Sequence, residues 1–490
     1  MKTQDYLAMD AVGLAEAMRR GATSASAVLE TALDLADAVQ PVLNALTVDF
    51  RDRARTRAAA FDADRTEVRA SVLAGVPFAL KDIGAALEGS VTSSGSRMFA
   101  GARDPGTSTL VQRYLDAGLV LFGRSATPEF GIHCETFSAL HGTTRNPWDL
   151  SRSPGGSSGG AAALVAAGVI PAAQGSDGGG SIRIPAAHCG LVGLKPTRGR
   201  LPSGPLVGEG WSGLAGSHVL TRTVRDTAAF LDIAQGWEPV APSSPENAHL
   251  RFADTVGQLP DRPLRIAVSE FGRELCATDP EIAACLRETA RTLASMGHQV
   301  VLRDPDIDHA AAMSVLWQIV GINLAAWVDA LCHAQGRSTP NADEIEPATA
   351  ACLAAVNGLS AEDGIRLMWQ RDAVCARFSA IFAEVDLLLS PVTPRPAQPV
   401  GSTPFRGDWA EYAARLYSAI PYTPILNLAG LPGLSLPMGQ TASGLPIGLQ
   451  FAARFGREDL LLGLAGVLEA EAGPTGFNRI APSPARVQPS

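Results

Sequence analysis

Lysine is nearly absent from this sequence of 490 residues. Of its 40 basic side chains only three are lysines, at positions 2, 81 and 195. Arginine keeps its proton at physiological pH, whereas a lysine removed from water can become a neutral amine and act as a base. Lys81 ends an apolar, strand-like segment, 75–80. Base chemistry at Lys81 is one interpretation, and a structural ion pair with Asp82 is the alternative.

The sequence also lacks the patterns that hold metals, nucleotides or disulfides. Its seven cysteines are odd in number and include no CxxC pair, and its eight histidines show no metal-ligand spacing. Neither HExxH nor GxxxxGK[ST] occurs. These absences predict reduced thiols and chemistry that needs no metal and no other cofactor.

Basic blocks and long apolar runs are missing as well. The net charge is −9, so nucleic acid and anionic membranes are poor partners. The N-terminus has no apolar signal-peptide core, and the longest low-charge stretch, 159–176, is short and contains Pro171. We therefore expect a cytoplasmic protein that acts on a small molecule and binds neither nucleic acid nor membrane.

Helical and strand-like segments alternate along the chain, and 46% of the residues are hydrophobic. This alternation favours an α/β fold with a mostly parallel or mixed sheet. We predict one domain over residues 1–490. Its parts are N-terminal helices (about 1–65), a catalytic core (about 70–305), a helical excursion near the substrate side (about 309–385), a return to the sheet (about 386–473) and an irregular tail (474–490).

Capping residues and chain breakers set the expected ends of these elements. A helix over 24–39 begins at an N-cap, Thr23 or Ser24, and Pro41 is its expected stop. A strand over 120–122 is expected to end at Gly123.

Two glycine-rich segments hold the strongest functional signal. They read GGSSGG over 155–160 and DGGGSIR over 177–183, and each contains a serine, Ser157 and Ser181. A serine becomes a nucleophile when a base takes its proton, and bare backbone N–H groups can stabilise an oxyanion. With Lys81 as the base, the pattern indicates acyl transfer. A flexible linker is the alternative, but the apolar helical pattern after 158 disfavours it.

Several further motifs occur beside these segments, and together they cover nearly the whole chain. They lie at 107–110, 128–131, 145–149, 189–197, 222–226, 427–432 and 444–450. The joint pattern resembles the amidase signature family, with a motif style closest to its bacterial aryl-acylamidase and cyclic nylon-oligomer hydrolase branches. The resemblance implies that family's fold, a large mixed twisted β-sheet flanked by helices on both faces.

The resemblance also implies a Ser–cis-Ser–Lys triad. Ser181 would be the nucleophile, Ser157 the bridging serine after a cis peptide bond, and Lys81 the base. The implied oxyanion hole consists of backbone N–H groups, and three further residues would support the loop. The hole is formed by Gly178, Gly179, Gly180 and Ser181, and the supporting residues are Ser158, Asp177 and Arg183.

One position departs from the family pattern. Gly178 stands where the family usually has the threonine of Asp-Thr-Gly-Gly-Ser, so we expect a looser loop and a missing side-chain contact. For Asp177 and Arg183, a solvated ion pair is the alternative to loop support.

The segment after 129–131 lines the acyl pocket in the family. Here it offers Ile132 and Cys134 as wall residues, although core packing is the alternative for each. Trp317 and Trp327 are candidates for an aromatic lid, and at helical spacing core packing is again the alternative.

These features predict an amidohydrolase that cleaves the C–N bond of a linear or cyclic carboxamide through an acyl-Ser181 intermediate and releases a carboxylic acid and ammonia or an amine. The alternatives are an amidotransferase-type amidase subunit with a partner protein, and an esterase or carbamate hydrolase of the same family. A GxSxG elbow at 155–159 is disfavoured because no buried strand precedes it. His188 and Cys189 are expected to be packed, not catalytic. A homodimer is expected from the family alone.

Overall fold

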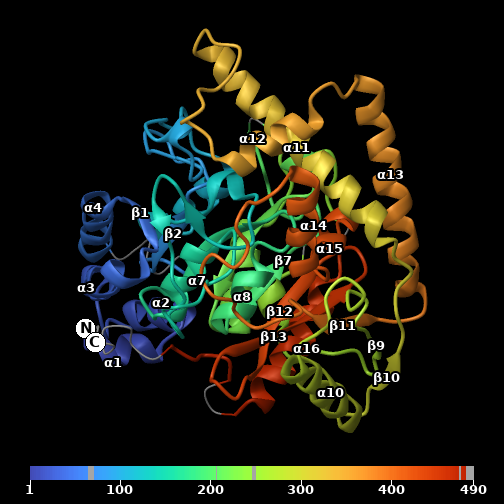
Figure 1. Cartoon of the computed structure of the whole chain (residues 1–490). Helices are drawn as coiled ribbons and strands as arrows, with labels where there is room; N and C mark the ends of the chain where they lie inside the picture. Colours follow the sequence, from blue (N-terminus) through green and yellow to red (C-terminus); the bar gives the residue numbers. More distant parts are fainter. Residues whose placement is uncertain (65–70, 206, 246–249, 474–475, 482–490) are drawn as a thin grey trace.

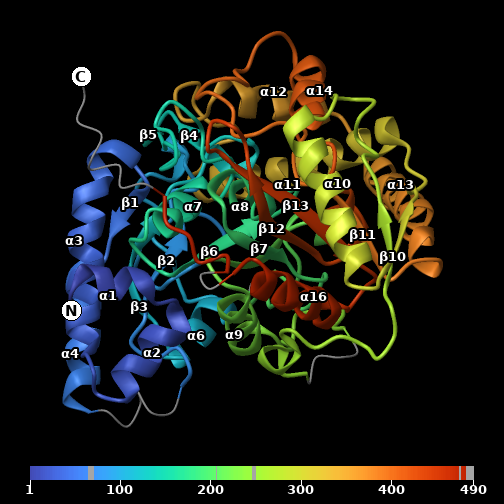
Figure 2. The ribbon, with the colours of Figure 1, turned by 90° about the horizontal axis from the view of Figure 1, so that it is seen from below.

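The computed structural model describes residues 1–64, 71–205, 207–245, 250–473 and 476–481. A mixed eleven-stranded sheet crosses its centre in the order β1-β3-β2-β6-β8-β7-β12-β13-β11-β9-β10 (Figures 1 and 2). The strands are β1 (Leu46–Asp49), β2 (Pro77–Lys81), β3 (Val120–Ser125), β6 (Ala172–Asp177), β7 (Val192–Lys195), β8 (Gly216–Thr221), β9 (Arg265–Val268), β10 (Gln299–Leu302), β11 (Leu387–Pro391), β12 (Gly433–Gln440) and β13 (Pro446–Ala453). A hairpin of β4 (Phe137–Ser138) and β5 (Gly142–Thr143) lies outside this sheet.

Fifteen α-helices surround the sheet within the described part of the chain. They are α1 (Thr3–Ala8), α2 (Ala11–Arg19), α3 (Ala25–Leu43), α4 (Arg51–Ala63), α6 (Thr109–Asp116), α7 (Gly159–Ala166), α8 (Arg183–Cys189), α9 (Val224–Ala234), α10 (Pro280–Ser295), α11 (His309–Ala334), α12 (Pro347–Val356), α13 (Ala361–Ser379), α14 (Trp409–Ala419), α15 (Pro424–Ala429) and α16 (Glu458–Glu471). Helices α1–α4 gather at the β1 edge of the sheet, and α10 and α13 lie toward the opposite edge (Figures 1 and 2).

Alternation along the strands explains why helices cover both faces. On β7 and β13, Gly193 and Gly448 face α8 so closely that a Cβ on either would approach Ala186 or Ala187 within 2.6 Å. The neighbouring Leu194 points to the other face, into a cluster shared with α9, α10 and α16. Successive side chains of a strand point to opposite faces, so both faces are buried. The predicted α/β fold with a mixed sheet between helices is confirmed.

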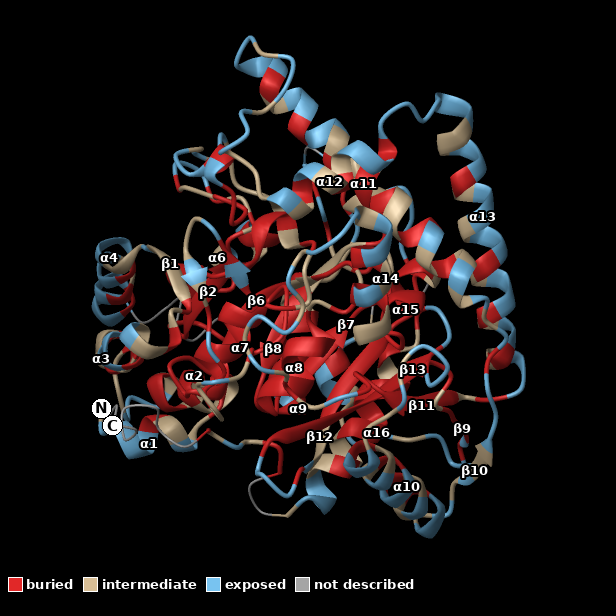
Figure 3. Cartoon of the chain, viewed as in Figure 1, coloured by how far each residue is buried: buried red, intermediate tan, exposed pale blue. Residues whose placement is uncertain are grey.

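Helices α11, α12 and α13 lie over one end of the sheet, and their outward faces are exposed (Figures 1 and 3). Their buried residues join a hydrophobic cluster that also contains Tyr417 and Ile425 of α14 and α15. By length and composition alone, α11 would pass as a membrane-crossing helix, a test that buried core helices also pass; 44% of its most apolar window is buried. The division into one domain with a helical excursion stays a prediction, and residues 474–475 and 482–490 of the expected tail lie outside the described residues.

Two expected boundaries are wrong. Helix α3 continues through Pro41 to Leu43 and ends at Asn44, which adopts a left-handed conformation with φ 49°. The buried Val39 and Leu43 keep this last turn packed against the core. Strand β3 likewise continues past Gly123 to Ser125, because it pairs in parallel with β2 as far as Lys81.

The parallel arrangement of β2 and β6 positions the candidate site. Strand β2 ends at Lys81 and its neighbour β6 ends at Asp177. The carboxyl ends of neighbouring parallel strands meet at one edge of a sheet, where ligand sites commonly form. The segment that follows β6 therefore starts beside Lys81.

The close approach of α7 to the sheet gives a stability prediction. A Cβ on Gly160 would lie 2.3 Å from the backbone nitrogen of Ala126, so Gly160→Ala must displace the backbone. Overpacking of this kind costs about 1–3 kcal/mol. In α13, a methyl group on Gly364 would meet no other atom within 4 Å, so Gly364→Ala is the matched control and should stabilise by about 0.5–1 kcal/mol. Urea unfolding of both variants measures the contrast, and equal effects would contradict it.

Candidate active site

The side chain of Lys81 is fully buried, with no exposed surface. Its Nζ donates to Ser157 Oγ at 2.7 Å and to Ser176 Oγ at 3.0 Å. Burial lowers the pKa of Lys81 to about 7, and the negative charge of Asp177 opposes this shift only in part. Near neutral pH a large fraction of the side chain is therefore the free amine, which is the form that accepts a proton.

Ser157 lies next to Lys81 in a tightly packed segment of the backbone. The Gly156–Ser157 peptide bond is cis. A Cβ on Gly156 would lie 2.7 Å from the carbonyl oxygen of Glu135, so only glycine fits there. The next residue, Ser158, exchanges hydrogen bonds with the backbone of Ser176 on β6, at 3.2 and 3.3 Å. The two glycine-rich segments are thus tied directly to each other.

Asp177 and Arg183 hold the loop between β6 and α8. Their side chains are fully buried and joined at 2.8 Å, so the interpretation as a solvated ion pair does not apply. The Asp177 carboxylate also accepts the backbone N–H groups of Gly180 and Ile182. Burial alone would raise the pKa of Asp177, but the charge and hydrogen bonds of Arg183, with a hydrogen bond from the Asn427 side chain, hold it well below its usual range.

This arrangement corrects one predicted oxyanion donor. The N–H of Gly180 donates to Asp177 Oδ1 at 2.7 Å, so it is used inside the loop. Gly178, Gly179 and Ser181 line the cavity, and no hydrogen bond among the described residues engages their N–H groups. The set of candidate donors is therefore reduced from four to three.

Ser181 lines the cavity, and its backbone lies beside the segment that carries Ser157. Its carbonyl oxygen accepts the N–H of Ser158 at 3.2 Å, which fixes its backbone beside Ser157. In the described structure no hydrogen bond joins the Oγ atoms of Ser157 and Ser181. Hydrogen bonds between catalytic groups are often long before substrate binds. The missing hydrogen bond therefore does not exclude proton transfer between Ser181 and Ser157.

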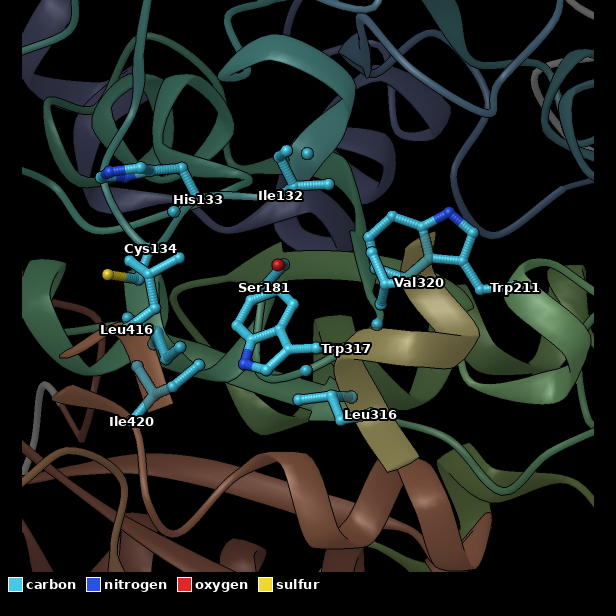
Figure 4. Close-up of a pocket in the computed structure, with 15 residues that line it drawn as sticks. Ile132, His133, Cys134, Ser181, Trp211, Leu316, Trp317, Val320, Leu416 and Ile420 are labelled. Carbon is cyan, nitrogen blue, oxygen red and sulfur yellow. The ribbon is translucent and has the colours of Figure 1, made fainter. Parts of the chain in front are cut away.

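The cavity at Ser181 is narrow, about 40 Å³, and mostly apolar. Its lining includes the two predicted wall residues, Ile132 and Cys134, and the lid candidate Trp317, and Figure 4 shows them around Ser181. Its remaining apolar side chains come from α8, α11, α14 and the segments beside them: Ile184, Trp211, Leu316, Val320, Leu416 and Ile420. A second cavity of about 400 Å³ shares Ile132 and His133 with it.

Of the two tryptophans expected to form an aromatic lid, Trp317 lines the cavity and Trp327 does not. Trp327 is absent from the residues that line the cavity and packs against Phe99 and Phe130 with 37% of its surface exposed. The space beside Gly178 is occupied, contrary to the expected missing contact. The indole of Trp211 lies so close that a Cβ on Gly178 would be 2.6 Å from its Cε3 and Cζ3 atoms.

Sequence reasoning missed Ser176, the second hydrogen-bond partner of the Lys81 amine. Gln174, two residues earlier on β6, accepts a hydrogen bond from the Lys81 backbone N–H, so the period of two in β6 could have indicated Ser176.

His188 and Cys189 are buried, which raises the pKa of the Cys189 thiol and lowers that of His188 to about 4. Within the described ranges, no group of three or more His, Cys, Asp or Glu residues could hold a metal.

Comparison with known proteins identifies the family of the chain. The Amidase family matches residues 27–462. The 6-aminohexanoate-cyclic-dimer hydrolase of Paenarthrobacter ureafaciens is 33% identical, over 94% of each chain. A structure of 6-aminohexanoate cyclic dimer hydrolase complexed with substrate has a TM-score of 0.90 at 31% identity, covering 97% of this chain and 99% of that one. A bacterial aryl acylamidase of the amidase signature family has a TM-score of 0.84 at 25% identity, covering 96% and 97%. The chain therefore belongs to the amidase signature family and is an amidase.

Proposed function

We propose that this protein hydrolyses carboxamide C–N bonds through an acyl intermediate on Ser181. The observation that carries the proposal is the contact of the buried Lys81 amine with Ser157 Oγ at 2.7 Å, beside the loop that holds Ser181. A desolvated amine with a pKa near 7 can accept a proton at neutral pH, and a neighbouring hydroxyl can pass one on.

In the acylation step, Ser181 Oγ forms a bond to the carbonyl carbon of the amide. Its proton moves to Ser157 Oγ while the Ser157 proton moves to Lys81 Nζ. Ser181 Oγ thus exchanges its proton for the bond to carbon, and Ser157 Oγ exchanges one proton for another. The tetrahedral oxyanion accepts hydrogen bonds from the N–H groups of the loop. When the C–N bond breaks, the same relay returns the proton to the leaving amine.

In the deacylation step, water attacks the acyl group on Ser181. Lys81 again takes a proton through Ser157, and the carboxylic acid leaves as Ser181 regains its hydrogen. Every proton that Lys81 accepts is given back within the cycle, and the reaction needs no cofactor.

The cavity supports a neutral, compact amide as substrate. Its titratable lining groups are His133 and Cys134, and burial lowers the pKa of the histidine and raises that of the thiol to about 12, which keeps both uncharged. An ionic substrate would lose its hydration without a partner there. A cyclic amide has no charged ends, and the relatives named for a cyclic dimer of 6-aminohexanoate make cyclic and simple neutral amides the first class to test.

The same oxyanion chemistry serves an ester or a carbamate, so these hydrolyses belong to the proposal as side activities.

An amidotransferase subunit is not favoured, since the net charge of −9 does not suit a transfer-RNA-linked substrate. The cytoplasmic location and the homodimer stay predictions, and the mass of the purified protein in solution tests the second.

Replacement of the nucleophile is the first test. Ser181→Ala should lower kcat/KM on a hydrolysed amide by about four orders of magnitude or more, because the variant lacks the hydroxyl on which the acyl intermediate forms. Ser314→Ala, on the exposed face of α11, is the matched control and should keep full activity. Amide turnover that survives Ser181→Ala would refute the proposed mechanism.

The rate should also depend on the protonation of Lys81. Because the free amine is the base, kcat/KM should rise with pH through a midpoint near 7, and Lys81→Arg should be inactive since arginine keeps its proton. Burial also lowers the pKa of Lys195 to about 7, so Lys195→Met is the control and should keep the midpoint. A flat wild-type profile between about pH 5.5 and 9 would contradict Lys81 as the base.

A further inference from the structure

We propose that Trp211 sets the size of the substrate group that this enzyme accepts, and that it does so as one half of a complementary pair with Gly178. The inference rests on the proposed amide hydrolysis and names its specificity-determining residue. The indole fills the place beside the nucleophile loop that a side chain at position 178 would take. Substrates with a compact, unbranched group on this side of Ser181 fit, and branched or aromatic groups are excluded.

The backbone at Gly178 shows that the indole, not the chain conformation, excludes a side chain. Its φ lies outside the left-handed region, so an L-residue can adopt this conformation. The obstacle is steric, because a Cβ there would be 2.6 Å from Cε3 and Cζ3 of Trp211. Real Cβ contacts are essentially never so short. A side chain at position 178 and the indole of Trp211 would therefore occupy the same space, so only one of the two positions can carry a large residue.

The turn that carries Trp211 is held from three sides. Trp211 and Ser212 both have φ near 50°, in the left-handed region. Asn323 on α11 donates to Ser212 Oγ at 2.9 Å, and Arg371 on α13 donates to the Ser212 carbonyl at 3.1 Å. Arg198 donates to the Gly213 carbonyl at 2.6 Å. Because three hydrogen bonds hold this turn, the indole has a fixed position in the wall of the cavity.

The same turn is connected to the nucleophile loop. The side-chain amide of Asn427 donates to the carbonyl of Leu214 at 3.0 Å and to that of Asp177 at 2.8 Å. One residue thus anchors both the turn after Trp211 and the start of the loop that ends at Ser181. The distance between the wall and the nucleophile is fixed by this shared anchor.

The position of Trp211 in the cavity indicates which side it closes. Figure 4 shows Trp211 beside Val320 on one side of Ser181, and Cys134 and Ile420 on the other. The second cavity begins at Ile132 and His133, and Trp211 is not among the residues that line it. A substrate can extend into that larger space, whereas on the other side Trp211 limits it.

The test compares Trp211→Ala and the graded variant Trp211→Phe with the wild type. Each is assayed on amides in which first the acyl group and then the amine is enlarged from methyl to isopropyl to phenyl. The kcat/KM ratio of large to small substrate should rise about tenfold or more in Trp211→Ala, less in Trp211→Phe, for one of the two ends. Trp327→Ala, outside the cavity on α11, is the control and should leave the ratio unchanged. An unchanged ratio in both Trp211 variants, with cooperative thermal unfolding retained, would overturn the inference.

A double-mutant cycle tests the pairing itself. Gly178→Ala should lower kcat/KM about tenfold or more in the wild-type background, because the new methyl group and the indole cannot coexist without displacing the loop. In Trp211→Ala the same change should cost little, since the space is then free. Equal losses in both backgrounds would show that Gly178 and Trp211 act independently.

A covalent probe separates this inference from the proposed function. Alkyl fluorophosphonates label an activated serine without any amide substrate, so labelling rates with a methyl and a bulky alkyl reagent report the size of the site. Trp211→Ala should favour the bulky reagent by about tenfold relative to the wild type. If the wild type is labelled but cleaves no amide, the proposed function fails while the role of Trp211 is still measured. Identical rate ratios in both proteins would overturn it.

Discussion

The site depends on one costly arrangement, an amine taken fully out of water. Lys81 contacts two hydroxyls, those of Ser157 and Ser176, and neither carries a charge that would hold its proton. Desolvation therefore prevails over the more distant attraction of Asp177 and brings the pKa to about 7. An arginine at this position would remain charged and lose its hydration without compensation, which explains a lysine in a chain that otherwise uses arginine.

The second constraint is the fixed geometry of the loop between β6 and α8. A buried ion pair between Asp177 and Arg183 is stable only when its other hydrogen-bonding sites are satisfied. Here Arg183 also donates to Gln450 and Asn427, residues that come from the far end of the chain. The loop that presents Ser181 is thus held by strands and helices more than 240 residues away in sequence.

Much of this could be predicted from the sequence, for physical reasons that also explain the failures. Glycine-rich loops and the rare Lys81 carry local chemical signals, and the alternating elements gave the fold class. Contacts between distant segments carry no such signal. The indole of Trp211 against Gly178 spans 33 residues (211 − 178), and the use of the Gly180 N–H by Asp177 depends on how the loop turns. The run of α3 through Pro41 likewise reflects tertiary packing that outweighs a local breaker.

The central claim, a shared acyl intermediate on Ser181, is tested most directly by partitioning. Two amides with the same acyl group and different amines are hydrolysed in the presence of hydroxylamine, and the ratio of hydroxamate to carboxylic acid is measured for each. If both amides pass through the same acyl-enzyme, the amine has already left when the nucleophiles compete, and the two ratios are identical. A ratio that changes with the leaving amine would mean that water attacks the amide directly and would contradict the account.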